Sequence, residues 1–100
     1  MIAARFLPAA RLEFLAEVLY YNNVQPELAR RFAGAVEDAT ARALAFPRSG
    51  APTRDNSRRI LVKDFPFSII YREEPAGIVI FAVAHHAQRA YYWQSRTRAR

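Results

Sequence analysis

The first half of the chain carries apolar residues at helical spacing. Between positions 9 and 23 these form two adjoining stripes, namely Leu12, Leu15 and Leu19 beside Phe14, Val18 and Tyr21. The pattern predicts a helix that buries a broad face. Pro8 suits its first turn, where a missing N–H costs nothing, and Asn22 and Asn23 favour a helix end or a turn.

A second helix is predicted to begin at Pro26. Its apolar stripe consists of Leu28, Phe32, Val36, Ala39 and Ala43. The charged residues of this segment lie off the stripe, which is typical of a helix with one buried face. Two helices joined by so short a turn are expected to form an antiparallel hairpin.

The second half changes from helical to alternating spacing. Residues 46–57, FPRSGAPTRDNS, are polar and rich in breakers, and we expect one long loop there. Three β-rich runs follow, RRILVK, FSIIYREE and IVIFAVAHH, separated by DFP and PAG. With a short strand at residues 2–6, the sequence predicts an α+β fold: a strand, a two-helix hairpin and a three-stranded antiparallel meander, giving a four-stranded sheet with the helices on one face.

Alternation divides each predicted strand between a helix-covered face and an open face. The covered set is Ile60, Val62, Phe67, Ile69 and Tyr71, and the open set is Arg59, Leu61, Lys63, Ser68, Ile70 and Arg72. The last strand is apolar in both phases and is expected to lie inside the sheet. Either His85 or His86 faces the open side at its end, and alternation leaves the choice open.

Charge is concentrated after residue 46. The first 46 residues are neutral, and the remainder holds the whole formal charge of +6. All of its basic residues except Lys63 are arginines, whose forked guanidinium suits phosphate and carboxylate groups. We therefore expect an anionic partner, either nucleic acid or an acidic protein segment; the alternative is a basic face that serves solubility.

Length and composition predict one domain over residues 1–93, followed by a mobile basic tail over residues 94–100. The chain has no cysteine, which suits the reducing cytoplasm, and no run near the ~20 apolar residues of a membrane span. We expect a soluble cytoplasmic protein that uses no cofactor, metal or membrane.

The order and spacing of several segments resemble the RelE/ParE superfamily of type II toxins, in particular its ParE-like branch. The segments are PELARRF, FPRSGAP, RRILVKDFPFSIIYR and IVIFAVAHHAQRAYYW. The resemblance spans residues 2–93. It implies a stress-response or plasmid-maintenance toxin, neutralised by a cognate antitoxin with which it forms an oligomer.

The resemblance also implies a target. ParE-like members are associated with poisoning of DNA gyrase, whereas RelE-like members cut messenger RNA on the ribosome. A third possibility is a non-toxic member that only binds its antitoxin. The histidine-ended last strand and the FPFSIIYR segment favour the gyrase-associated branch, and hence a protein without catalysis of its own.

The nuclease hypothesis and the binding hypothesis each imply candidate site residues. For a metal-independent nuclease, phosphate would be held by Arg59, Lys63 and Arg72, and acid–base chemistry would come from His85, His86, Tyr91 or Tyr92. For binding of the target or the antitoxin, the candidates are Arg58, Arg59, Lys63, Arg72, Arg89 and Trp93. Tyr91, Tyr92 and Trp93 are also expected to pack over the end of the sheet.

Overall fold

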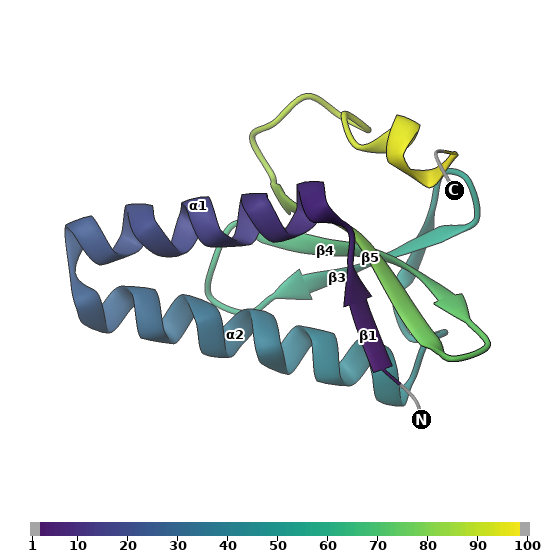
Figure 1. Ribbon diagram of the computed structural model, residues 1–100, viewed down its shortest axis with the longest axis horizontal. Coiled ribbons are helices and arrows are strands. Elements are labelled where there is room, and N and C mark those ends of the chain that lie inside the picture. Colours follow the sequence, from purple (N-terminus) through teal and green to yellow (C-terminus); the bar gives the residue numbers. More distant parts are fainter. Residues whose placement is uncertain (1–2, 99–100) are drawn as a thin grey trace.

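The computed structural model describes residues 3–98 and shows a helical hairpin packed against one twisted sheet (Figure 1). The strands are β1 (Ala3–Phe6), β2 (Ala51–Thr53), β3 (Ser57–Val62), β4 (Phe67–Glu74) and β5 (Gly77–His85). The helices are α1 (Pro8–Val24), α2 (Pro26–Ala45) and the short 3₁₀ helix η1 (Gln94–Thr97). The predicted first strand was to begin at Ile2, which lies outside the described residues.

Both long helices begin at a proline, as predicted. The first helix does not end at Asn22 or Asn23; it continues to Val24. Gln25 alone links the two helices, with an extended backbone at φ −168° and ψ 123°. Its conformation follows from Pro26, because a proline disfavours helical geometry in the residue before it.

The sheet has five strands, in the order β1-β5-β4-β3-β2, so the prediction of four strands was wrong. The extra strand β2 comes from the expected long loop and pairs antiparallel with β3. Asp55 and Asn56 make this hairpin possible by adopting left-handed conformations, with φ of 59° and 57°. Pro52 is tolerated because β2 is an edge strand.

Strand β5 lies inside the sheet, as predicted, with antiparallel β4 on one side and parallel β1 on the other. Gly77 allows β1 to lie close to β5. Its φ is +137°, and a Cβ atom there would lie 1.9 Å from the carbonyl oxygen of Ala3. Only glycine fits this position.

The main core lies between the helices and one face of the sheet. As predicted, Ile60, Val62, Phe67, Ile69 and Tyr71 are buried there. The prediction for α1 was partly wrong: the stripe of Phe14, Val18 and Tyr21 packs against the core, but Leu12, Leu15 and Leu19 are exposed. In a layer of only two helices, α1 contacts α2 and the sheet through part of its circumference. None of the helices in the described range is long and apolar enough to cross a membrane.

The opposite face of the sheet is not open, contrary to prediction. Residues 86–98 fold back across it, with the yellow η1 at their end (Figure 1). Trp93 lies in a second buried cluster, which also contains Ile70, Val79, Phe81, Ala82 and Ala84. Both phases of β5 are apolar because both of its faces are buried. Ile70 pairs with Ala82 and Tyr71 with Ile80, so Phe81 is an extra residue and its side chain joins Ala82 in this second cluster.

The C-terminal segment was expected to be a mobile tail from residue 94. The structure places its first residues against the body of the protein instead. Thr97 is buried, and Arg96 forms an ion pair of 2.9 Å with Glu13 of α1. The packed part of the domain thus continues past Trp93, while residues 99 and 100 of the expected tail lie outside the described range.

Candidate protein-binding site

A pocket of about 390 Å³ lies where the C-terminal segment crosses the sheet. Strands β3 and β4 contribute Arg59, Ser68 and Ile70 to its wall. The C-terminal segment contributes most of the remainder, including His86, Arg89, Tyr91, Tyr92 and Trp93. Seven of the sequence-predicted candidates therefore meet at one place: Arg59, His85, His86, Arg89, Tyr91, Tyr92 and Trp93.

The two histidines have different surroundings. His86 is exposed, and its Nε2 lies 2.8 Å from the hydroxyl of Ser68, on the face opposite the helices. His85 pairs with Phe67 across the strands, and their rings meet edge to face at 4.8 Å between centroids. Its Nδ1 accepts a hydrogen bond from the N–H of Ala87. Of the pair, His86 thus has the side chain on the side left uncovered by the helices.

Tyr91 shapes the rim of the pocket. It has a left-handed backbone with φ of 59°, an uncommon conformation for a bulky side chain. Its ring is held on two sides, edge to face by Trp93 and by the guanidinium of Arg54, which lies 3.7 Å from the ring centroid. Arg54 was not predicted as a site residue, because its position in an expected loop carried no periodic signal.

The contacts of Tyr92 do not favour an acid–base role. Its hydroxyl donates a hydrogen bond of 2.7 Å to Oε2 of Glu13, beside the Arg96 guanidinium. Partial burial, and then the Glu13 carboxylate, raise the pKa of Tyr92 well above its ordinary value. The sequence did not indicate that Glu13 belongs to the site, because its partners lie some seventy residues or more away along the chain.

Of the three predicted phosphate-binding residues, Lys63 lies apart from the other two. Arg59 lines the pocket, but Lys63 lies beyond the Val62–Phe67 pair, in a separate hollow beside Asp38 and Arg42. Arg59 pairs with Ile70, two positions along β4 from Arg72, so these two arginines are diagonal neighbours in the sheet, although they line different pockets. The three residues therefore do not line one pocket, because Lys63 lies four positions, or about 13 Å, along the chain from Arg59.

Arg58 and Arg72 line another pocket, at the far end of the sheet. Arg89 is exposed at the rim of the first pocket, whereas Trp93 is only 4% exposed and forms part of its wall. The site thus presents arginine and aromatic groups around a hollow, a composition common at protein interfaces.

Comparison with known proteins identifies the family. Residues 4–90 match the family described as the ParE toxin of the type II toxin-antitoxin system, parDE. The chain belongs to the ParE toxin family. The predicted resemblance to the ParE-like branch is thereby confirmed.

A solved structure of the chromosomal ParDE toxin-antitoxin system from P. aeruginosa is similar to this ParE-family chain, with a TM-score of 0.72 and 19% sequence identity. The match covers 85% of this chain and 96% of that one, and it supports the ParE-like fold. No curated protein matches the chain significantly.

Proposed function

We propose that this ParE-family chain is a cytoplasmic toxin that inhibits growth by binding DNA gyrase, and that a cognate antitoxin neutralises it by forming a complex with it. Membership of the ParE toxin family supports the toxin and antitoxin parts of the proposal. The choice of a protein target rests on the site: the pocket around Arg59 combines arginines with a fixed aromatic rim and offers few groups for acid–base chemistry.

The contacts at the pocket favour binding of a protein target over cleavage of RNA. RNA cleavage needs one group to take a proton from the 2′-hydroxyl and another to protonate the leaving oxygen. The Tyr92 hydroxyl donates a hydrogen bond to Glu13, and Nδ1 of His85 accepts one from the N–H of Ala87. The remaining acid–base candidates that line this pocket are His86, which lies beside Ser68, and Tyr91, whose ring contacts Arg54 and Trp93.

A ribosome-dependent nuclease is the alternative, and one observation favours it. Arg59 and His86 line the same pocket, so a phosphate held by the arginine would lie near an imidazole. His86 and the rim residue Tyr91 would then have to serve the two proton transfers. A family member that binds its antitoxin without being toxic is the third alternative.

Two assays on the purified chain separate these functions. We expect the chain to trap gyrase–DNA cleavage complexes and to leave the primer-extension pattern of translated messenger RNA unchanged. Arg59→Gln should weaken the gyrase effect about tenfold, whereas Arg30→Gln, which removes an exposed arginine paired with Glu27, should not. New RNA ends that disappear in His86→Ala would establish the nuclease, and unimpaired growth on expression would support the non-toxic alternative.

A further inference from the structure

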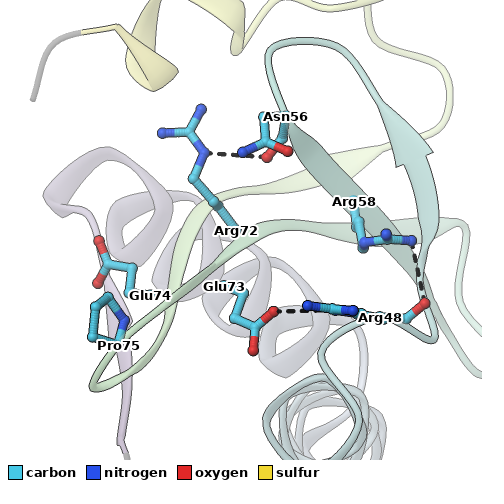
Figure 2. Close-up of a pocket in the computed structure, with 7 residues that line it drawn as sticks. All are labelled: Arg48, Asn56, Arg58, Arg72, Glu73, Glu74 and Pro75. Atoms are coloured by element: carbon cyan, nitrogen blue, oxygen red, sulfur yellow. Dashed lines mark hydrogen bonds and ion pairs between the residues drawn. The ribbon is translucent and has the colours of Figure 1, made fainter.

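A hollow of about 370 Å³ lies between the two long helices and the end of β1. The helices α1 and α2 are joined at Gln25 and separate toward the other end of the hairpin, where β1 lies (Figure 1). The hollow shares no lining residue with the pocket around Arg59, nor with the pocket of Arg58 and Arg72 that Figure 2 shows. It is thus separate from the site proposed to bind gyrase.

The walls of this hollow are mainly apolar. Its lining consists of Phe6 from β1, Arg11 and Phe14 from α1, and Val36, Glu37, Thr40, Ala41 and Leu44 from α2. The rings of Phe6 and Phe14 lie 6.3 Å apart between centroids, and Val36 is buried. Small-molecule sites have volumes of about 300–1,000 Å³, apolar walls and a few polar groups. The hollow therefore suits one ring or branched side chain with its attached polar groups.

Two side chains of opposite charge line the hollow without contacting each other. Arg11 and Glu37 are both exposed, and within residues 3–98 neither forms an ion pair. The Arg11 guanidinium lies 5.6 Å from the centroid of the Phe6 ring, beside the apolar wall. A ligand that carries both a negative and a positive group can pair with the two residues at once.

The lining also contains a hydroxyl that lacks a partner. Among the side chains of residues 3–98, Thr40 has the one buried oxygen or nitrogen without a hydrogen bond, its Oγ1. Such atoms are rare in folded proteins, because an unmade hydrogen bond costs free energy. A threonine in a helix has two accessible χ1 rotamers, so a change of rotamer can turn this hydroxyl toward a bound polar group.

We propose that this hollow binds a free α-amino acid with an apolar side chain. The side chain occupies the hollow, the α-carboxylate pairs with the forked guanidinium of Arg11, and the α-ammonium pairs with Glu37. A ligand with a single charge would leave one of these two residues unpaired. A residue within a protein chain is disfavoured as well, because its amino and carboxyl groups are in peptide bonds and carry no charge.

The test titrates the whole isotope-labelled chain with L-phenylalanine and follows the amide resonances of the lining residues by NMR. We expect a Kd of about 0.1–1 mM, a range that suits so small a ligand. N-acetyl-L-phenylalaninamide keeps the side chain but has neither charge, and it should bind about tenfold more weakly or worse. Glycine keeps both charges but has no side chain, and the same loss is expected.

Variants of the two charged residues test their roles. Arg11→Gln and Glu37→Gln should each weaken binding of L-phenylalanine about tenfold. Arg30→Gln removes an exposed charge elsewhere on α2 and should change the affinity by less than about twofold. Thr40→Val keeps the shape of the side chain and removes the hydroxyl, so a loss of about threefold is expected. Melting temperatures show whether each variant is folded.

Equal binding of L-phenylalanine and its neutral analogue would overturn the proposal, because the hollow would then accept an apolar side chain of a protein. So would equal losses in Arg11→Gln, Glu37→Gln and Arg30→Gln, or unchanged resonances of the lining residues at about 10 mM ligand. None of these results bears on gyrase, since Arg11 and Glu37 lie outside the pocket around Arg59.

Discussion

Glu13 of α1 and Arg96 of η1, at opposite ends of the chain, form a half-buried ion pair of 2.9 Å on the outer side of β5. Strand β1 has ended by this point, after its pairing with Ile80. Glu13 accepts from the N–H of Val83, and Arg96 donates to the carbonyl of Phe81. The pair therefore satisfies the backbone groups of β5 that β1 no longer covers.

Glu13→Ala should lower the free energy of unfolding by about 2–3 kcal/mol, because it leaves the Val83 N–H, the Tyr92 hydroxyl and Arg96 without their acceptor. Urea unfolding measures the change. Glu27→Ala, which breaks an exposed pair with Arg30, should cost under about 1 kcal/mol. If Glu13→Ala and Arg96→Ala have additive effects in the double variant, the two side chains are not coupled.

Truncation after Trp93 should lower stability as well as toxicity. The cut removes Arg96 from its ion pair and the buried Thr97 from its contact with Asp55. Truncation after Arg98 keeps both contacts and should leave the melting temperature unchanged. Equal melting temperatures for both truncated proteins would show that η1 contributes nothing to stability.

Trp93→Ala should cost about 3–5 kcal/mol, since the indole is 4% exposed and fills the second core cluster with Ile70 and Phe81. Chemical denaturation gives the value. Tyr91→Ala offers the comparison, because that ring is 40% exposed at the rim. A smaller loss for Trp93→Ala than for Tyr91→Ala would mean that the segment does not pack on the sheet as described.

Gly77→Ala should destabilise the protein by more than about 3 kcal/mol, because the methyl group would lie 1.9 Å from the carbonyl oxygen of Ala3 at a φ of +137°. Gly34→Ala is the matched control. No atom lies within 4 Å of a Cβ built there, and alanine favours a helix interior, so we expect a gain of about 1 kcal/mol. Thermal melting of both variants should show shifts of opposite sign.

The turn at Asp55 should confer sensitivity to acid. The hydrogen bond from Thr97, and to a smaller extent the Arg98 charge, lower the pKa of Asp55 below its ordinary 3.8. Because the folded state has the lower pKa, this contribution to stability is present above pH 3.8 and is lost as the pH falls through the folded value.

Asp55→Asn tests this, since asparagine tolerates the left-handed backbone of the turn but does not ionise. Between about pH 5 and about pH 2, the original chain should lose more stability than the variant. Parallel curves of melting temperature against pH would contradict the assignment.

The sequence by itself determined the local structure of this protein. Pro8 and Pro26 marked the starts of both helices, and alternation correctly assigned Ile60, Val62, Phe67, Ile69 and Tyr71 to the face that the helices cover. These predictions succeeded because helical and strand periods depend on backbone geometry, which neighbouring residues set.

Contacts between distant segments decided the rest. Periodicity showed which residues share a face, but only the folded chain shows what covers that face. Residues 86–98 bury Ile70, whereas the leucines of α1 are exposed. Strand β2 forms only because it pairs with β3. Because Phe81 is an extra residue, the side chains of β5 that follow it lie on the faces opposite to those that strict alternation predicts. His85 pairs with Phe67, and His86 contacts Ser68. Lys63 shares a period with Arg59 yet lies in a separate hollow, because distance along a strand is independent of the face on which a side chain lies.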